Sequence, residues 1–341
     1  MVKVGIAGYG TIGKRVAEGV MKSDDMELVG VSKTTPDYGA YLAINKGIKV
    51  YAHSQQDIAN FEKAGFKVNG TIKDLLGKVD IVVDTSPGKK GVENKPLYEE
   101  AGVKMIFQGG EKASIAETSF NAQANYDMAW GKKSVRVVSC NTTGLSRVLN
   151  AIHSNIGVSE AKVVLIRRTC DPKEMKGLVN SIQPEMKIPS HHGPDLNTVI
   201  PDIKIESIAV VVPSTLMHVH TLMVEFKRNT TREELVNILK DTSRIILVKG
   251  EHGITATNTV IELSRDLGRP RYDLPEVVIW EDAINVKDGW GYMVYAVHQE
   301  SIVQPENIDA IRSMNKMLPK AESIKKTNKT LGLVNGYLYK V

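Results

Sequence analysis

Cysteine and long apolar runs are scarce in this sequence. Its 341 residues include two cysteines, Cys140 and Cys170, which are too few for a disulfide framework. No apolar run approaches the roughly 20 residues that a membrane-spanning helix requires. The N-terminal apolar stretch is broken by glycines and lacks a cleavage-like site, so a secretion signal is not expected. These absences indicate a protein of the reducing cytoplasm that does not contact a membrane.

Blocks of basic residues are also missing. Lys and Arg total 44 against 39 for Asp and Glu, a net charge of +5, but the lysines gather only as pairs such as Lys132-Lys133 and Lys325-Lys326. Proteins that bind nucleic acid concentrate basic residues in patches or arms, so nucleic acid is not expected as a partner. An anionic small ligand and a solvated lysine-rich surface are both compatible with this charge.

The residues that are present have the composition of a globular protein, 42% hydrophobic and 24% charged, in a chain long enough for two domains. The first half alternates apolar runs with amphipathic stretches. Helices are predicted at 12–22 and 91–102, and strands at 2–8, 26–32, 79–86, 103–110 and 135–140. Apolar strands separated by helices indicate a parallel sheet covered on both faces. Residues 1–139 are therefore expected to form a doubly wound α/β domain of the Rossmann type.

The second half has longer strands and fewer helices. Strands are predicted at 161–169, 203–212, 216–226, 276–282 and 291–299. Their alternation of polar and apolar residues favours a mainly antiparallel sheet with helices on one face. A helix is predicted at 231–240, opened by a capping box of Thr231 and Glu234. Residues 140–302 are thus expected to form an α+β catalytic domain.

The C-terminal stretch 303–341 is predicted to be helical again. Pro305 suits a first helical turn. An apolar stripe follows it, formed by Ile308, Ile311, Met314 and Leu318. A helix with such a stripe must bury it, and we expect it to do so by returning to the first domain.

A glycine-rich loop lies near the N-terminus. Residues 8–13 read GYGTIG, a G-x-G-x-x-G pattern that follows a predicted strand and opens a predicted helix. In this context the first glycine permits the turn, the second admits a pyrophosphate, and the third allows close packing of helix and strand. The helix N-terminus supplies N–H donors. The loop predicts a dinucleotide cofactor bound by Gly8, Gly10, Thr11, Ile12 and Gly13.

The end of the second predicted strand bears on the choice of cofactor. About 20 residues after the loop, NAD-specific enzymes place an acid on the ribose 2′-hydroxyl. Here Lys33 is followed by Thr34 and Thr35, which suit a 2′-phosphate. NADP is therefore the preferred cofactor, with NAD also accepted, unless Lys33 is simply exposed to solvent. Gly110 follows another strand of the same sheet, where ligands meet strand ends, and is added to the cofactor site.

Cys140 ends a predicted strand, and apolar residues at helical spacing begin at Leu145. A cysteine at a helix N-terminus is exposed to the positive end of the dipole, which favours the thiolate. Backbone N–H groups there could also stabilise an oxyanion. Taken alone, the position also fits a small buried hydrophobic residue.

Four segments together resemble the archaeal-type glyceraldehyde-3-phosphate dehydrogenases, and the resemblance extends along the whole chain. They are GYGTIG (8–13), SCNTTG (139–144), SHHGPD (190–195) and PSTLMHVH (213–220). The resemblance implies that Cys140 is the nucleophile, flanked by Ser139 and Asn141 at the substrate. Gly144 stands where the bacterial and eukaryotic branch has a second cysteine, so the chain matches the archaeal branch.

The same resemblance implies an activity. It is the phosphorylating oxidation of D-glyceraldehyde 3-phosphate to 1,3-bisphosphoglycerate through a cysteine thioester, in glycolysis or gluconeogenesis. Hydride passes to NAD(P), and inorganic phosphate is the second substrate. The family also implies a homotetramer. The most similar alternatives are aspartate-semialdehyde dehydrogenase and N-acetylglutamyl-phosphate reductase, against which the MHVH and SHHGPD segments argue.

Two histidines are candidates for the base that a nucleophilic cysteine needs. His218 and His220 lie two residues apart on a predicted strand, so both point to one face and the spacing does not choose between them. The resemblance implies His218. It also places the substrate phosphate near His191 and His192, puts Arg168 at the cofactor or substrate site, and assigns Gln299 to the nicotinamide carboxamide.

The sequence favours neither a metal site nor a nucleotide-sensing regulator. A metal site would draw on the histidines and Cys170, but no pair of ligands has structural-zinc spacing, so no metal is expected. A nucleotide-sensing regulator would need a recognition helix or a basic arm, and the sequence has neither. No chemistry is assigned to Cys170.

Overall fold

The computed structural model describes residues 1–339. Its internal contacts divide the chain into two compact units. One comprises Met1–Ser139 and Val303–Leu331, and the other comprises Cys140–Ile302 together with the residues from Gly332 onward. The chain therefore passes between the units at the residue just before Cys140.

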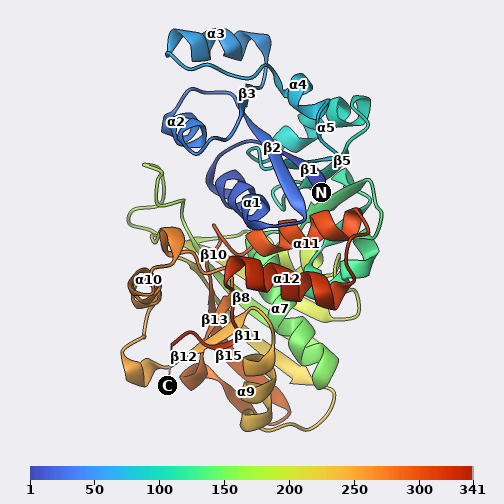
Figure 1. Cartoon of the computed structure of the whole chain (residues 1–341). Coiled ribbons are helices and arrows are strands. Elements are labelled where there is room, and N and C mark those ends of the chain that lie inside the picture. Colours follow the sequence, from blue (N-terminus) through green and yellow to red (C-terminus); the bar gives the residue numbers. More distant parts are fainter. Residues whose placement is uncertain (340–341) are drawn as a thin grey trace. The chain divides into compact units, whose positions relative to one another are not determined.

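The first unit is built on a parallel sheet of seven strands in the order β3-β2-β1-β4-β5-β7-β6 (Figure 1). The strands are β1 Val2–Ala7, β2 Met26–Lys33, β3 Val50–Ala52, β4 Ile81–Asp84, β5 Lys104–Phe107, β6 Thr118–Phe120 and β7 Ser134–Val137. The helices are α1 Thr11–Lys22, α2 Tyr38–Asn45, α3 Gln55–Lys63, α4 Ile72–Leu76, α5 Lys90–Glu100, α6 Ala122–Asn125, α11 Gln304–Met314 and α12 Lys320–Leu331. The predicted doubly wound α/β fold is confirmed.

The second unit holds a nine-stranded mixed sheet in the order β16-β12-β13-β15-β11-β8-β10-β9, with β14 paired to β15. The strands are β8 Val158–Arg168, β9 Gln183–Pro184, β10 Lys204–Val212, β11 His218–Phe226, β12 Ile245–Val248, β13 Val277–Trp280, β14 Asn285–Lys287, β15 Trp290–Val297 and β16 Gly336–Tyr337. Its helices are α7 Cys140–Asn155, α8 His192–Leu196, α9 Arg232–Asp241 and α10 Thr257–Asp266. Most pairs are antiparallel, as predicted, while β8–β10, β12–β13 and β12–β16 are parallel.

Helix α11, which follows the second unit in the sequence, packs within the first unit. Figure 1 shows α11 in red beside α1 in blue. The two helices approach closely because Gly19 has no side chain: a Cβ there would lie 3.0 Å from Cδ1 of Ile308. Ile308, Ile311 and Met314 are fully buried, as the stripe predicted, and Leu318 lies beyond the end of α11 and is half-buried.

The prediction that the whole stretch 303–341 returns to the first domain is wrong for residues 332–339. Gly336 and Tyr337 form β16, which pairs in parallel with Ile246 and Leu247 of β12 in the second sheet. The backbone N–H and C=O groups at this sheet edge find their partners in the C-terminal segment. Lys340 and Val341 lie outside the described residues.

The capping box predicted at the start of α9 is half right. The Thr231 hydroxyl accepts the backbone N–H of Glu234 at 3.1 Å. The Glu234 carboxylate instead binds Arg228, with Nη2 to Oε1 at 2.6 Å, and Thr230. A cation within reach of the carboxylate forms a stronger interaction than the N-cap N–H. Across residues 1–339, no helix has the length and apolarity needed to cross a membrane.

A buried ion pair anchors α11 to the N-terminal part of its unit. The Arg312 guanidinium is fully buried. It donates two hydrogen bonds to the Asp25 carboxylate, from Nε to Oδ2 at 2.9 Å and from Nη2 to Oδ1 at 3.1 Å. Burial raises the pKa of the Asp25 carboxyl, but its bonds to Arg312 and Lys326 outweigh burial and leave the pKa lowered. The pair therefore stabilises the folded state at neutral pH.

Replacing Arg312 with Met should reduce the free energy of unfolding by about 3 kcal/mol, because the partly buried Asp25 carboxylate loses its two bonds to Arg312 and keeps only Lys326 as a cationic partner. Since the folded pKa of Asp25 is lowered, its contribution is present above the unfolded pKa and is lost as pH falls below it. The difference between variant and parent should therefore shrink below about pH 4. Urea unfolding at pH 7 and pH 3 measures both effects, with Lys90→Ala, from the exposed Lys90–Glu93 pair, as control. A loss no larger than that of Lys90→Ala would contradict this assignment.

Candidate active site

Cys140 is the first residue of α7, so the predicted strand-to-helix position is confirmed, with the strand ending earlier, at Val137. The thiol is half-buried. Burial raises its pKa, while the positive charges of Arg168 and Arg167 and the backbone N–H groups of Asn141 and Cys140 lower it, and the net pKa is raised. The helix start does favour the thiolate as expected, but loss of hydration outweighs it.

The first turn of α7 is tied to two buried histidines through Asn141. The Asn141 Oδ1 accepts a hydrogen bond from Nε2 of His220 at 2.9 Å, and its Nδ2 donates to Nε2 of His192 at 3.2 Å. Asn141, His192 and His220 are at most 3% exposed. With this orientation of the amide, the proton positions on both rings follow from the hydrogen bonds.

The same chain of hydrogen bonds continues beyond His192. Since Nε2 of His192 accepts, its Nδ1 carries the proton and faces Oγ of Ser190 at 3.2 Å. Ser190 donates in turn to Oγ of Ser207 at 2.9 Å, and Ser207 donates to the Ser190 carbonyl at 3.0 Å. These bonds satisfy the ring of His192 and the two serine hydroxyls, whereas Nδ1 of His220 is buried without a hydrogen-bond partner among residues 1–339.

Gly144 lies one turn into α7, where a side chain has no room. A Cβ at this position would lie 2.6 Å from Cγ2 of Val297 on β15. The helix therefore packs against the sheet at this point through its backbone. Any side chain at this position, including a second cysteine, would require Val297 to move.

His218 begins β11 and is held by the backbone of the neighbouring strand. Its Nδ1 accepts the N–H of Arg168 at 3.0 Å, so the neutral ring carries its proton on Nε2. Burial, followed by the charges of His220, Arg168 and Arg167, lowers the pKa of His218 well below its ordinary value. Burial also lowers the pKa of His220 to about 3. Both rings are neutral at neutral pH.

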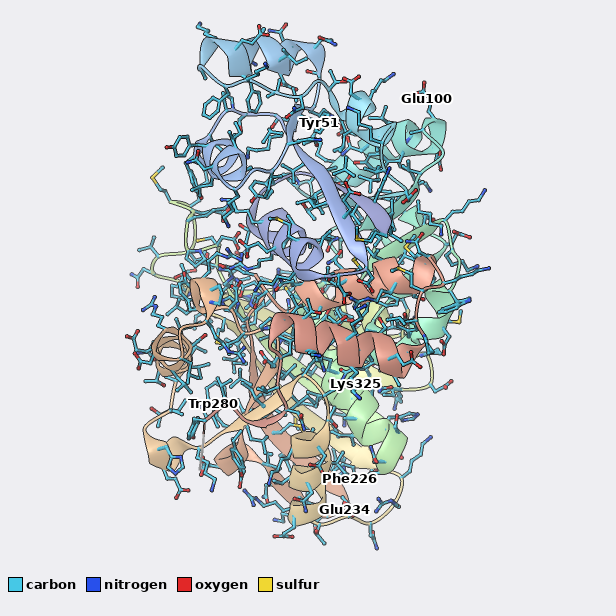
Figure 2. All side chains as sticks on the ribbon, in the orientation of Figure 1. Tyr51, Glu100, Phe226, Glu234, Trp280 and Lys325 are labelled. Atoms are coloured by element: carbon cyan, nitrogen blue, oxygen red, sulfur yellow. The ribbon has the colours of Figure 1, made fainter. Side chains whose placement is uncertain are left out.

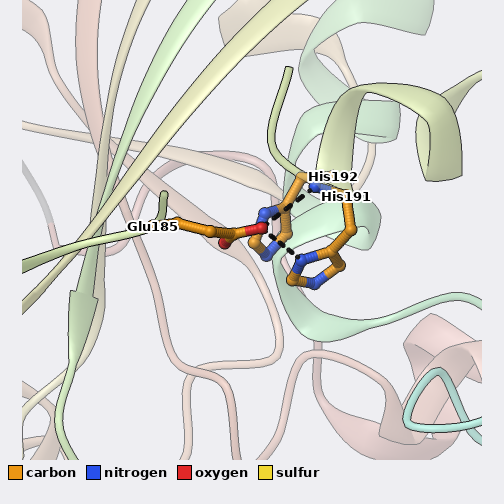
Figure 3. Close-up of side chains that lie close together, drawn as sticks. All are labelled: Glu185, His191 and His192. Atoms are coloured by element: carbon orange, nitrogen blue, oxygen red, sulfur yellow. Dashed lines mark hydrogen bonds and ion pairs between the residues drawn. The ribbon is translucent and has the colours of Figure 1, made fainter. Parts of the chain in front are cut away.

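The two residues of the SHHGPD segment that were expected at the substrate phosphate differ in environment. His191 is exposed, and its Nδ1 lies 3.1 Å from Oε1 of Glu185, whereas His192 is buried beneath it with the ring centroids 3.8 Å apart (Figure 3). Burial, with the charges of His191 and Arg167, lowers the pKa of His192 to about 2. His191 is accessible to an anion from solvent. His192 is linked to the first turn of α7 by its hydrogen bond to Asn141.

Arg168 is buried at the end of β8 and already has several acceptors. Its Nη1 donates to the Thr215 carbonyl at 3.1 Å and to Oε1 of Glu300 at 3.2 Å, and its Nη2 pairs with Asp171. Arg168 is expected at the cofactor or substrate site. It also positions the ring of His218, because its backbone N–H donates to Nδ1 of that ring. No sequence motif identifies Glu300 or Asp171 as partners of Arg168.

Gln299 has a buried side-chain amide. Its Oε1 and Nε2 are both buried, and neither has a hydrogen-bond partner among residues 1–339. A buried amide without partners costs free energy unless a ligand supplies them. A carboxamide offers the complementary donor and acceptor, so this side chain fits the nicotinamide role expected for it.

The glycine loop lies in the first unit and fits a dinucleotide. Gly8 has φ of +89°, and a Cβ on Gly13 would lie 2.0 Å from the Gly8 carbonyl oxygen. A Cβ on Gly10, in contrast, would meet nothing within 4 Å. The loop is therefore tight at its two ends and open at the centre, where the pyrophosphate would lie beside Thr11 and Ile12 at the start of α1.

The remaining cofactor candidates lie at the ends of other strands of this sheet. Thr34 is exposed just after β2, and Gly110 is exposed three residues after β5. Lys33, the last residue of β2, is buried and pairs with Asp37 at 3.0 Å. Sequence reasoning missed Asp37. An Asp just before a helix, four residues after a lysine, was the signal available.

Two groups of side chains have the spacing of metal ligands. Glu185, His191 and His192 form one, and Asp273, His298 and Glu300 form the other, each with ligand atoms within 4.8 Å. In the first group, Arg167 pairs with Glu185 and both ring nitrogens of His192 are hydrogen-bonded. In the second, Arg168 pairs with Glu300 and Arg271 with Asp273. These cations disfavour a metal ion at either group.

Replacing Asn141 with Ala should cost at least about 2 kcal/mol of stability, because two buried ring nitrogens lose their partner at once. Urea unfolding at pH 7 measures this loss. Asn155→Ala is the control, since Asn155 is on the same helix but exposed, with only a local bond to Ala151. Equal losses from the two variants would show that the buried chain of hydrogen bonds does not depend on Asn141.

Two families match the chain. Residues 139–272 match "Glyceraldehyde 3-phosphate dehydrogenase, C-terminal domain", which begins at the residue before Cys140. Residues 2–126 match "Dihydrodipicolinate reductase, N-terminus", which covers the sheet with the glycine loop.

Relatives match over nearly the whole length. The chain is 56% identical to the glyceraldehyde-3-phosphate dehydrogenase of Pyrococcus abyssi, over 98% of this chain and 99% of that protein. It is 57% identical to the enzyme of that name from Pyrococcus furiosus, with the same coverage, and 53% identical to that of Archaeoglobus fulgidus, over 97% of this chain and 98% of that protein. Likeness of this degree and extent, together with a cysteine at the start of α7 and a glycine loop fit for a nicotinamide dinucleotide, means that the chain belongs to the glyceraldehyde-3-phosphate dehydrogenase family of oxidoreductases.

Proposed function

We propose that the chain catalyses the phosphorylating oxidation of D-glyceraldehyde 3-phosphate with NAD(P), in the cytoplasm, as a step of glycolysis or gluconeogenesis. The observation that carries this proposal is the position of Cys140 at the helix start, within the same cluster of arginines and neutral histidines as His218. Two unpaired cysteines agree with a reducing compartment.

Cys140 is the proposed nucleophile. Its thiolate attacks the aldehyde carbon, and the carbonyl oxygen becomes the oxygen of a hemithioacetal. The nicotinamide cofactor, when bound, supplies the hydride acceptor. Loss of hydride from the carbon and of the proton from the oxygen leaves a thioester on Cys140. Inorganic phosphate then attacks the thioester carbonyl, releases the thiolate and gives 1,3-bisphosphoglycerate.

His218 is the proposed acid–base group. In the resting ring Nε2 carries the proton, because Nδ1 accepts the Arg168 N–H, so His218 first donates a hydrogen bond to the aldehyde oxygen. To act as the base, the neutral ring must carry its proton on Nδ1, so that Nε2 is free to accept the proton of the hemithioacetal. This step requires the hydrogen bond from Arg168 to break during the cycle. His220 is engaged with Asn141 instead.

The other site residues are given roles according to the polar groups of their side chains. We propose that His191 meets a phosphate, with His192, Asn141 and Ser139 shaping the substrate site around Cys140. Gln299 is proposed to hold the nicotinamide carboxamide, and Arg168 to position the catalytic groups beside the bound ligands. Lys33 and Thr34 support a preference for NADP over NAD.

The chain is also proposed to assemble as a homotetramer. The outward residues of β11, Val219, Thr221 and Met223, are half-exposed, and Tyr292 on β15 and Ile208 on β10 are exposed. An open hollow of about 570 Å³ on this side includes Val219, Val294 and Trp280, the last labelled in Figure 2. Residues 171–190 add exposed apolar side chains: Met175, Val179, Ile182, Met186 and Ile188. Apolar surface of this extent supports self-association.

The test of the reaction is a spectrophotometric assay of cofactor reduction. It uses glyceraldehyde 3-phosphate, NADP or NAD, and phosphate either present or omitted. Reduction that requires phosphate supports the proposal, and reduction independent of phosphate overturns the phosphorylating step. Aspartate semialdehyde is the competing substrate, and its preferential oxidation would favour the alternative enzyme class.

Cys140→Ser should abolish turnover and labelling by iodoacetate, while Cys170→Ser should keep both. Because the pKa of Cys140 is raised, the alkylation rate of Cys170→Ser should still be rising above pH 9.0, the ordinary thiol value. Mass spectrometry identifies the labelled site. Labelling of Cys170, or near-normal activity of Cys140→Ser, would refute the assignment.

His218→Asn should lower kcat roughly 10²- to 10⁴-fold, the usual contribution of a positioned acid–base group. Cofactor affinity, measured by fluorescence titration, should be unchanged. His220→Asn is the matched control, since His220 is equally buried and two residues away. If His220→Asn lost more kcat than His218→Asn, the roles of the two histidines would be exchanged.

A further inference from the structure

The ammonium of Lys33 is not free at the end of β2. Its side chain is 8% exposed, and Nζ lies 3.0 Å from Oδ1 and 3.2 Å from Oδ2 of Asp37. The Asp37 side chain is 45% exposed, so the carboxylate stands between the buried lysine and solvent. Any anion that approaches Lys33 from solvent meets this charge as well.

Asp37 is fixed in place by a second task. It is the N-cap of α2, and its Oδ1 accepts the backbone N–H groups of Gly39 at 2.8 Å and Ala40 at 3.1 Å. Burial raises the pKa of Asp37, but the hydrogen bond and charge of Lys33 and these two N–H groups outweigh burial and lower it. The carboxylate is thus a permanent charge with a fixed position.

We propose that Asp37 is a specificity-determining residue that acts as an internal counter-anion for Lys33. The 2′-phosphate of NADP must compete with the Asp37 carboxylate for the ammonium, while the 2′-hydroxyl of NAD need not. Asp37 therefore reduces the advantage that Lys33 gives to NADP and keeps NAD as a usable cofactor. This inference rests on the proposed function, because it assumes that Lys33 faces the cofactor ribose.

The position of Asp37 distinguishes this role from that of the acid found in NAD-specific enzymes. That acid ends the second strand and accepts the ribose hydroxyl. Here the strand ends in Lys33, and both Asp37 oxygens are already engaged by the lysine and the two N–H groups. Asp37 thus acts on the cofactor through charge and through Lys33.

Asp37→Asn tests the inference, because an asparagine keeps an oxygen for the cap and removes the charge. Isothermal titration of the full chain with NADP and with NAD gives both dissociation constants without catalysis. The Kd for NADP should fall by up to about fivefold, the effect of a half-exposed charge pair, and the Kd for NAD should stay the same. Glu18→Gln is the matched control. It removes one charge from the Lys46–Glu18 pair of the same unit, in which Lys46 is exposed and Glu18 is half-buried.

The coupling between the two residues is tested in a Lys33→Ala background. Lys33→Ala alone should weaken NADP, and the gain from Asp37→Asn should be smaller there than in the parent. An equal gain in both backgrounds would show direct repulsion and overturn the counter-anion role. Weaker NAD binding in Asp37→Asn would identify Asp37 as a ribose ligand and overturn it too. If the parent chain binds neither cofactor, the proposed function itself fails, which is a separate result.

Discussion

The burial of polar side chains around the first turn of α7 is the constraint on which the rest of the site depends. Asn141, His192, His220 and Ser190 are buried there, and each must find its hydrogen-bond partner within the protein. The same burial raises the pKa of Cys140 and keeps the histidines neutral. Such a site does not hold a permanent thiolate–imidazolium pair. The thiol must therefore lose its proton before the sulfur can act as a nucleophile.

In the first unit, the glycine loop offers a dinucleotide mainly its backbone. Gly8 and Gly13 are required by a positive φ and by a close approach to a carbonyl, and Gly10 leaves the centre of the loop open. Side chains enter mainly at the end of β2, where Lys33 and Asp37 form their pair. In the proposed function, affinity for a dinucleotide and selectivity for its phosphate would therefore be set by separate parts of one sheet edge.

Local patterns were sufficient for much of this protein. The parallel sheet, the glycine loop and the start of α7 could be predicted because each depends on neighbours in the sequence: apolar runs, a turn that only glycine permits, and helical spacing after Cys140. The short helices α2, α3 and α4 were not predicted, since their apolar stripes are brief. The pairing of Gly336 with β12 was not predicted either. A two-residue strand has no periodicity, and its partner lies about ninety residues away.

The sequence by itself determined the fold class, the nucleophile candidate and the cofactor class, because those depend on residue type and short spacing. Tertiary structure decided the chemistry of each group. Two histidines two residues apart look equivalent on a strand, but Nδ1 of His218 accepts an N–H from Arg168 while Nε2 of His220 binds Asn141. A lysine that reads as a free cation is paired with Asp37, and a helix-start cysteine has a raised pKa. Hydrogen bonding, pairing and burial depend on which distant residues fold against a side chain, and spacing along the chain does not contain that information.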